Sequence, residues 1–278
     1  MIKVKGIVFD VDNSVYPQAG WVDDSVAYVF RKLTSIIPTG PATGKNTDHC
    51  LGLAAGMGRK AWDFIIAESG AVFLYLIDGG PPPVFKDHNV CDISDLSKFK
   101  AAICLDENLC QFQNGHGEIT YWAELKRKIL TMYPPDKDFS VSQRWGEDFK
   151  SIADRAGLRL KIQVHSDAGI DIMPENISKK IGIEKICEIL GIKPEEILVV
   201  VDGINDLEMT DGTEVIVVSN ACSELKLRAA ERGWFVATQP EGEGFLQGLS
   251  FFASKGFFGE KSGEVLRIVK ESERFKFV

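Results

Sequence analysis

The sequence predicts an α/β protein in which a core built on a parallel sheet is interrupted by an inserted α+β domain. Two apolar runs of strand type, residues 4–9 and 197–201, lie far apart in the 278-residue chain. Continuous apolar runs of this kind are typical of interior strands of a parallel sheet. Each run leads directly into closely spaced aspartates, whereas the segment between the two halves follows another pattern. We therefore expect one core made from both ends of the chain.

The first part of the chain has the order of a βαβ unit. A strand over residues 4–9 is followed by a predicted helix over residues 24–35, where Val26, Phe30 and Leu33 fall on one face. A second helix and a second strand complete the first seventy or so residues in this interpretation. The resulting pattern predicts one edge of a parallel sheet covered by helices.

The last part of the chain resumes the same alternation. Residues 180–190 carry apolar side chains at helical spacing, and Gly191 is suited to end that helix. Pro194 can open a short turn before the apolar run 197–201. A further strand is expected over residues 215–218, followed by another helix.

The middle of the chain differs from both ends. A run of two glycines and three prolines over residues 79–83 interrupts the pattern. Further along, residues 158–165 and 169–173 form two strand-like runs separated by a short turn, which predicts a β-hairpin. We place the α/β core at residues 1–77 and 175–278, and the inserted α+β domain at residues 78–174.

Composition narrows the classes of partner. The net charge of −8 and the pI of about 5.2 argue against a nucleic-acid partner, because phosphate backbones are bound mainly by clustered Lys and Arg. No apolar run reaches the length of about 18 residues that a spanning helix needs, so we expect no membrane partner. The start of the chain leads into a strand rather than a signal peptide, which predicts a cytoplasmic protein.

Four carboxylates follow the two buried strands. If these strands are neighbours, Asp10, Asp12, Asp202 and Asp206 meet at one edge of the sheet, where open α/β sheets bind their ligands. Such a group repels itself unless a cation or proton lies between its members. A site of carboxylate oxygens without histidine or thiolate suits Mg²⁺. The alternative for Asp202–Asp206 is an Asn- and Gly-containing turn that caps the next helix.

These residues carry a family resemblance. In chain order, four segments resemble the four motifs of the haloacid dehalogenase superfamily, and their order resembles its Cof-type branch, with a large cap between the second and third motifs. The resemblance implies a Rossmann-like core with an inserted α+β cap that contributes substrate specificity. The four segments are Asp10-x-Asp12-x-Ser14, Thr43-Gly44-Lys45, Ser178-Lys179 and Asp202-Gly203-x-Asn205-Asp206.

The resemblance also implies roles. Asp10 is expected to attack phosphorus and form an aspartyl phosphate, with Asp12 as general acid and base and Lys179 as the fixed cation beside them. Mg²⁺ is expected to be held by Asp10, the main-chain carbonyl of Asp12, Asp202 and Asp206. The phosphate-binding residues implied are Thr43, Gly44, Lys45, Lys179 and Asn205.

Two assignments have competitors within the sequence. Lys180 stands beside Lys179, but it points about 100° away on a helix and lies outside the motif pattern. The segment before Thr43 contains two prolines and a glycine, which suit a strand interior poorly. The same segment resembles a Walker loop, but Thr39 and Asn46 stand where that pattern needs Gly and Ser or Thr.

The sequence of the inserted domain says less about ligands. Its aromatic side chains at helical spacing are interpreted as core, and the basic run 126–128 as a solvated helix face. His165 and Asp171, on the predicted hairpin, are better candidates for facing a ligand.

The leading functional hypothesis is a Mg²⁺-dependent phosphomonoesterase acting on a small phosphorylated metabolite, either a sugar phosphate or a phosphorylated hydroxy acid. One alternative is a phosphomutase of the same fold, which returns the phosphoryl group to the substrate. Another is a degenerate member that binds phosphorylated ligands without turnover. The retained carboxylates and lysine favour catalysis, because a binding module gains nothing from a second carboxylate beside the first.

Overall fold

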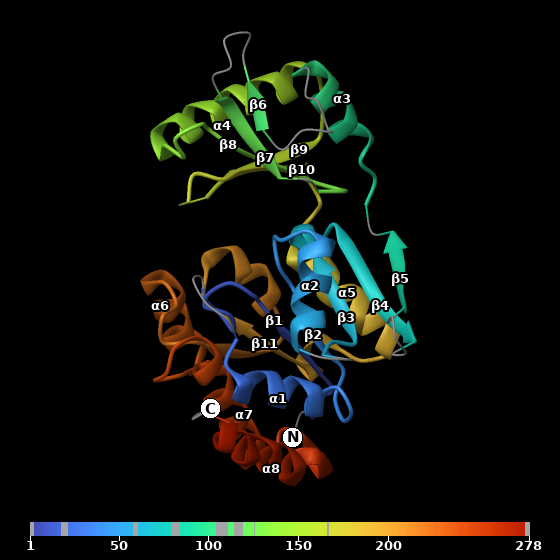
Figure 1. The fold of residues 1–278 in the computed structure, drawn as a ribbon, viewed down its shortest axis with the longest axis vertical. Helices are drawn as coiled ribbons and strands as arrows, with labels where there is room; N and C mark the ends of the chain where they lie inside the picture. The colour runs from blue at the N-terminus through green and yellow to red at the C-terminus, as the bar shows by residue number, and fades with distance from the viewer. Residues whose placement is uncertain are drawn as a thin grey trace. The chain divides into compact units, whose positions relative to one another are not determined.

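The computed structural model describes residues 3–17, 22–57, 61–78, 84–89, 91–103, 111–113, 119–124, 126–165 and 167–275. Two compact units divide the chain (Figure 1). The first combines Met1–His88 with Ser178–Val278, and the second is Asn89–Ile177. Within the described residues, no helix is long and apolar enough to cross a membrane.

A five-stranded parallel sheet forms the centre of the first unit. Its order is β13-β12-β11-β1-β2, and β1 and β11 pair in register with Phe9 opposite Val200. The two apolar runs predicted as strands are therefore neighbours, which meets the condition for their aspartates to converge, and all five residues of β11 are buried. The strands are β1 Gly6–Phe9, β2 Thr39–Pro41, β11 Ile197–Val201, β12 Glu214–Val217 and β13 Phe235–Val236.

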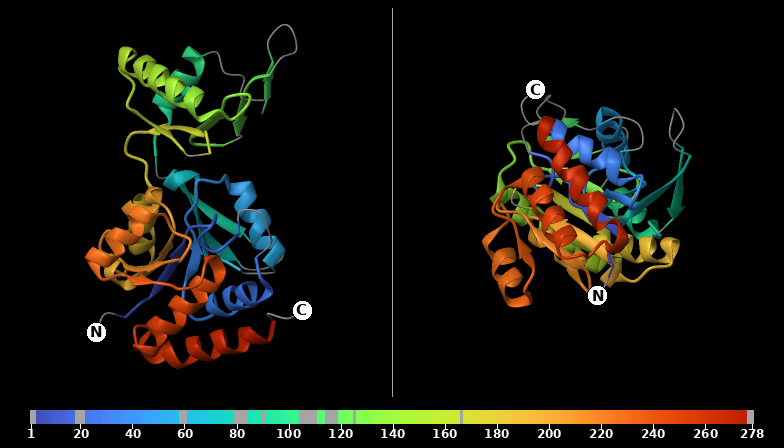
Figure 2. Two further views of the ribbon diagram at one scale, coloured as in Figure 1. Left: turned by 90° about the vertical axis from the view of Figure 1, so that its left-hand side faces the viewer. Right: turned by 90° about the horizontal axis from the view of Figure 1, so that it is seen from below.

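Helices of the first unit bury the apolar stripes that the sequence predicts. In α1 the buried residues include Val26, Phe30 and Leu33, and α5 ends at Gly191, whose φ is 63°. α8 packs against both α1 and α7 (Figures 1 and 2). The helices are α1 Asp24–Leu33, α2 Thr47–Met57, α5 Lys179–Leu190, α6 Ser223–Arg232, α7 Glu241–Ser254 and α8 Ser262–Ser272. The 3₁₀ turns are η1 Glu68–Gly70, η2 Pro194–Glu196, η3 Ile204–Thr210, η4 Gly259–Lys261 and η5 Glu273–Phe275.

A smaller sheet of the order β3-β4-β5 also involves the first unit. Its strands are β3 Phe64–Ala67, β4 Val72–Asp78 and β5 Val84–Asn89. The Gly- and Pro-rich residues 79–83 lie outside the described residues, and the strands on either side of them share this sheet. The second unit consequently begins at Asn89 and ends at Ile177, whereas the sequence pattern placed the insertion at residues 78–174.

The second unit packs two helices against an antiparallel sheet of the order β6-β7-β8-β10-β9. The predicted hairpin is present as β9 and β10. Aromatic residues belong to the core here, since the rings of Phe99 and Phe149 lie 5.7 Å apart and Trp145 packs on Phe149. The elements are β6 Gln111–Gln113, β7 Ile119–Glu124, β8 Leu130–Tyr133, β9 Leu160–Val164, β10 Ile170–Pro174, α3 Ser94–Ala102 and α4 Phe139–Arg155.

Candidate active site

Asp10 and Asp12 lie in a tight turn at the carboxyl end of β1. The Asp10 amide donates to the Val200 carbonyl at 3.0 Å, which continues the pairing of β1 with β11 by one residue. Asn13 adopts a φ of 58°, a conformation that Asn tolerates better than most residues. The Asn220 side-chain amide donates to the Asn13 carbonyl at 2.7 Å. The turn after Asp10 is thus held in place by a residue from beyond β12.

Asp202 and Asp206 occupy the corresponding position after β11. The Ser14 hydroxyl, which is fully buried, donates to Asp202 Oδ1 at 2.7 Å and so orients this carboxylate from the β1 turn. Asp206 is also fully buried, and its Oδ2 accepts from the Gly203 amide at 3.3 Å. The segment therefore is a turn leading into η3, yet its carboxylates face the site and do more than cap η3.

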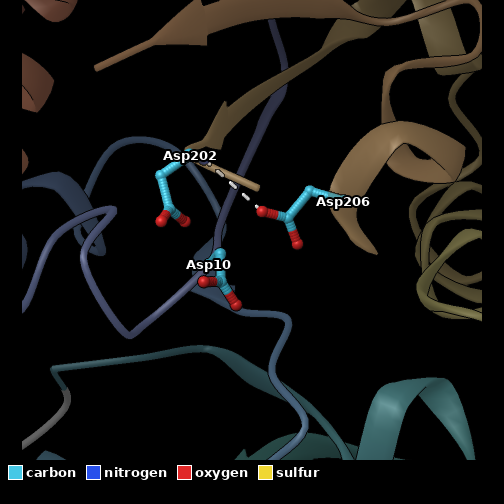
Figure 3. Close-up of side chains that lie close together, drawn as sticks. All are labelled: Asp10, Asp202 and Asp206. Atoms are coloured by element: carbon cyan, nitrogen blue, oxygen red, sulfur yellow. Dashed lines mark hydrogen bonds between the residues drawn. The ribbon is translucent and has the colours of Figure 1, made fainter. Parts of the chain in front are cut away.

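Three carboxylates converge at this edge of the sheet (Figure 3). Oxygens of Asp10, Asp202 and Asp206 all lie within 4.8 Å of one another. Asp10 and Asp206 are almost completely buried, and Asp202 is half-buried. The group has the oxygen-only chemistry and the spacing that suit a hard divalent cation.

Lys179 is the buried cation of this cluster. It is the first residue of α5, and its Nζ lies 2.5 Å from Oδ1 of Asp10 and 2.5 Å from Oδ1 of Asp206. Only 4% of the Lys179 side chain is exposed. Lys180 instead pairs with the exposed Asp211 at 2.5 Å. Of the two neighbouring lysines, the structure brings Lys179 to the carboxylates.

The charges of the cluster do not balance, and the pKa values reflect this. Burial raises the pKa of Asp10 well above its usual range, and the charge of Asp206 adds to the rise against the opposing charge of Lys179. Burial likewise raises the pKa of Asp202 to about 6. For Lys179, burial favours the neutral form, but the two carboxylates outweigh it and leave its pKa above the usual value. A single ammonium group is too little positive charge for three closely spaced carboxylates, two of which are buried.

The Thr43–Lys45 segment follows β2, which forms in spite of its glycine and proline. A Cβ on Gly40 would lie 2.1 Å from the Phe64 carbonyl, so glycine permits the close approach of β2 to β3. Thr43 is buried, and its amide donates to the Ile66 carbonyl at 2.9 Å. The doubt that the strand composition raised is removed, because β2 pairs with β1 in parallel register.

Lys45 and Asn205 contact the acidic residues from two sides. Lys45 Nζ lies 3.0 Å from Oδ2 of Asp12, and both side chains are partly exposed. The exposed Asn205 places its Nδ2 3.5 Å from Asp206 Oδ1. Ser14 and Asn220 were not among the predicted site residues, although Ser14 ends the first of the four motif segments. Their roles depend on hydrogen bonds across the chain, which a linear pattern does not show.

A second polar cluster, partly buried, lies within the second unit. The sequence predicted that Lys126 lies on a solvated helix face, and this prediction is wrong. Lys126 follows strand β7, and only 4% of its side chain is exposed. Its Nζ donates to Thr131 at 2.6 Å and lies 2.8 Å from Glu124. Asp171 accepts from Thr131 and lies 3.0 Å from His165 Nε2. We call these five residues the Lys126 cluster.

Several known proteins are similar to this chain. A family model described as sucrose-6F-phosphate phosphohydrolase matches residues 142–253. A Streptococcus pyogenes protein, whose name describes a bifunctional phosphatase and peptidyl-prolyl cis-trans isomerase, is 24% identical over 264 residues. That match covers 89% of this chain but 53% of the relative, so the chain spans about half of that protein's length. The phosphoglycolate phosphatase of Methanococcoides burtonii is 25% identical over 256 residues, covering 91% of this chain and 98% of that protein.

Solved structures share the fold. The sucrose-phosphatase of Synechocystis, determined with sucrose and phosphate, aligns with a TM-score of 0.60 at 16% identity, covering 91% of this chain and 98% of that one. A haloacid dehalogenase-like hydrolase from Bacteroides thetaiotaomicron aligns with a TM-score of 0.63 at 16% identity, covering 96% and 100%. The chain is similar in fold to proteins of the haloacid dehalogenase superfamily. The matching family model, these two relatives and the Synechocystis structure all carry the name of a phosphatase or a phosphohydrolase.

Proposed function

We propose that this protein is a Mg²⁺-dependent phosphomonoesterase that works through an aspartyl phosphate on Asp10. The observation that supports this most directly is the buried Lys179 ammonium, 2.5 Å from both Asp10 and Asp206. This contact orients the Asp10 carboxylate and favours its charged form in a water-poor site. A carboxylate held in this way can act as a nucleophile toward phosphorus.

The covalent steps need two carboxylates with different tasks. An Asp10 oxygen forms a bond to phosphorus while the bond from phosphorus to the ester oxygen breaks, and Asp12 gives that leaving oxygen a proton. Asp12 then accepts a proton from water as the water oxygen attacks phosphorus, which releases phosphate and restores Asp10. The partial exposure of Asp12 suits this exchange, since both proton transfers involve groups that enter and leave the site.

The cationic and polar groups bind the transferring phosphoryl group. Lys179 supplies the charge nearest to Asp10, and the Thr43 hydroxyl, the Gly44 backbone and Asn205 are the proposed donors to the phosphoryl oxygens. Lys45, paired with Asp12 at 3.0 Å, holds the general acid and base beside the leaving group. These groups act by orientation and charge, which is the main contribution of a protein to phosphoryl transfer.

The carboxylates fit a divalent cation. Asp10, Asp202 and Asp206 present oxygens within 4.8 Å of one another, and the raised pKa values of Asp10 and Asp202 reflect an excess of buried negative charge. We propose that these three residues and the main-chain carbonyl of Asp12 hold Mg²⁺. When bound, Mg²⁺ neutralises charge between the anionic nucleophile and the anionic phosphate.

The proposed substrate is a small phosphorylated metabolite, either a sugar phosphate or a phosphorylated hydroxy acid. The names of similar proteins support both classes, since one relative is a phosphoglycolate phosphatase and one similar structure is a sucrose-phosphatase. The second unit, which lies between the second and third motifs in the chain, is the proposed source of specificity.

The first test is hydrolysis of p-nitrophenyl phosphate. We expect turnover that requires Mg²⁺ and stops with EDTA, and we expect Asp10→Asn to lower kcat by about 10⁴-fold or more because it removes the nucleophile. Asp211→Asn is the matched control, since Asp211 is exposed and pairs with Lys180 away from the site. Calorimetric titration of the metal-free protein with Mg²⁺ checks binding separately, and Asp202→Asn is expected to weaken it.

A panel of sugar phosphates and phosphorylated hydroxy acids then separates the substrate classes. Release of inorganic phosphate supports a phosphatase, whereas formation of a phosphate-ester isomer would identify a mutase. Absence of Mg²⁺-dependent turnover with every compound would contradict the proposal.

A further inference from the structure

The segment Glu68–Gly70 has an unusual backbone. Three consecutive residues have positive φ values, 52° at Glu68, 57° at Ser69 and 99° at Gly70. The left-handed region disfavours residues other than glycine, and strain of this kind persists only where the surrounding structure holds it. The segment follows β3 directly and leads into β4. Contacts on either side of the segment must therefore hold this backbone conformation.

On one side, this segment holds the loop after β2. The Glu68 amide donates to the Lys45 carbonyl at 2.9 Å, and the Ser69 amide donates to the Thr43 carbonyl at 2.9 Å. Both amides donate to carbonyls of the same loop. Two consecutive residues thus fix the backbone at both ends of the Thr43–Lys45 segment.

On the other side, Gly70 lies against the start of α5. A Cβ at this position would lie 2.0 Å from the Ser178 carbonyl oxygen and 3.1 Å from the Lys179 nitrogen. One turn further along α5, a Cβ on Gly182 would lie 2.4 Å from the Ile66 side chain. Strand β3 and the segment after it therefore contact α5 at two points, both through glycines.

We propose that Glu68–Gly70 is the positioning element for Lys179. This inference rests on the proposed catalytic role of Lys179. Its Nζ reaches Asp10 and Asp206 at 2.5 Å each, so a small displacement of the Lys179 backbone loses one of the two contacts. The close approach of Gly70 sets where α5 begins, and the two amides tie that point to the Thr43–Lys45 loop. One strained segment thus fixes two phosphate-binding elements relative to each other.

The main test compares two glycine substitutions. Gly70→Ala adds a methyl group against the Ser178 carbonyl, and we expect kcat for p-nitrophenyl phosphate to fall about 100-fold because Lys179 is displaced. Gly191→Ala is the matched control. Gly191 also has a positive φ, 63°, but it ends the same helix, and no atom lies within 4 Å of the point that a Cβ would occupy. The control is expected to keep kcat within about twofold of the wild type, although it carries similar backbone strain.

A series of substitutions at Ser69 tests the backbone conformation of the segment without adding atoms next to α5. The series replaces the main test if the Gly70→Ala variant does not fold. Ser69→Gly and Ser69→Asn allow a left-handed backbone, and we expect both to retain kcat within about threefold. Ser69→Val resists that conformation and is expected to lower kcat about tenfold. A loss in Ser69→Gly as large as in Ser69→Val would show that the hydroxyl acts and would overturn the proposal.

A binding measurement separates this inference from the proposed function. Calorimetric titration with inorganic phosphate reports the position of Lys179 without turnover. We expect Gly70→Ala to weaken phosphate binding about tenfold relative to Gly191→Ala, and to weaken it no further when Lys179→Met is already present. If Gly70→Ala weakens binding equally with and without Lys179, the segment is a general support of the fold and the inference fails. If the wild type shows no turnover but the binding pattern holds, the proposed function alone fails.

Discussion

Two polar clusters of this protein each place carboxylates around a buried lysine, and they differ in charge balance. In the active site, Asp10, Asp202 and Asp206 share one ammonium group, that of Lys179. In the Lys126 cluster, Asp171 contacts both Lys126 and His165. Lys179 and Lys126 are equally buried, each with 4% of its side chain exposed. Burial of the lysine is therefore not what distinguishes the two clusters.

The pKa values of Asp171 and Asp10 are shifted in opposite directions. For Asp171, burial favours the neutral form, but the His165 hydrogen bond and the Lys126 charge outweigh it and lower its pKa. For Asp10, burial dominates and its neighbouring carboxylates add to it, so the pKa rises. A cluster with matched positive and negative groups stabilises its own charges, whereas a cluster with excess carboxylates is stabilised by binding a cation. The comparison supports the chemical role that we propose for the site around Asp10, and it favours a structural role for the Lys126 cluster.

The largest expected effect comes from replacing each buried lysine by methionine. Lys179→Met is expected to lower kcat about 10³-fold or more, because it removes the charge beside the nucleophile. Lys126→Met is expected to leave kcat for p-nitrophenyl phosphate within about threefold, although loss of a buried partner destabilises the fold by about 3 kcal/mol. Steady-state kinetics and urea unfolding of both variants measure this difference. A comparable loss of turnover in Lys126→Met would mean that the second cluster takes part in catalysis.

The same substitution at two aspartates is expected to change stability in opposite directions. Asp171→Asn removes a carboxylate that its neighbours stabilise, and we expect the free energy of unfolding at pH 7 to fall by about 2–3 kcal/mol. Asp10 has a raised pKa in the fold, so its ionised form opposes folding above the pKa of the unfolded chain. Asp10→Asn should then raise the stability of the metal-free protein by about 1 kcal/mol.

Chemical denaturation in EDTA measures both changes, with Asp136→Asn as an exposed control in the second unit. Destabilisation by Asp10→Asn of the same size as by Asp171→Asn would show that Lys179 already balances the active site. The proposed need for a divalent cation would then lose its electrostatic basis.

The smallest expected effect is a pH dependence from His165. Burial favours neutral His165, but the hydrogen bond and charge of Asp171 outweigh it and raise the pKa of the imidazole. The stabilising contribution is therefore complete below the unfolded pKa of about 6.5 and is lost as pH rises through the higher folded pKa. The unfolding free energies of wild type and His165→Gln should differ by about 1 kcal/mol near pH 5.5 and converge toward pH 8.5.

Urea unfolding at intervals across this range checks the prediction, and the exposed His49→Gln is the matched control. A difference that grew with rising pH would show that His165 is buried as a neutral group. The Lys126 cluster would then resemble the active site in being electrostatically strained.

Several parts of the fold were accessible from local pattern alone. Strand β11 is a run of five buried residues, and a continuous apolar run predicts such a strand without knowledge of its neighbours. The end of α5 at Gly191 follows from the left-handed conformation that glycine adopts readily. Strand β2 was harder to predict, because its glycine is needed for a close approach to Phe64, which lies on another strand. The position of Lys126 was missed for the same reason, since its partners come from three strands, β7, β8 and β10.

The sequence by itself determined that carboxylates follow the two central strands. Once these strands pair in parallel, the side chains at their carboxyl ends must meet at one edge of the sheet. The sequence also determined which lysine stands at the start of α5. Only the tertiary structure decided how many charges share each buried volume. Three carboxylates meet one ammonium group at Asp10, while Asp171 meets two cationic partners. The reason is physical, since electrostatic free energy depends on distances between residues far apart in the chain, which local propensities do not contain.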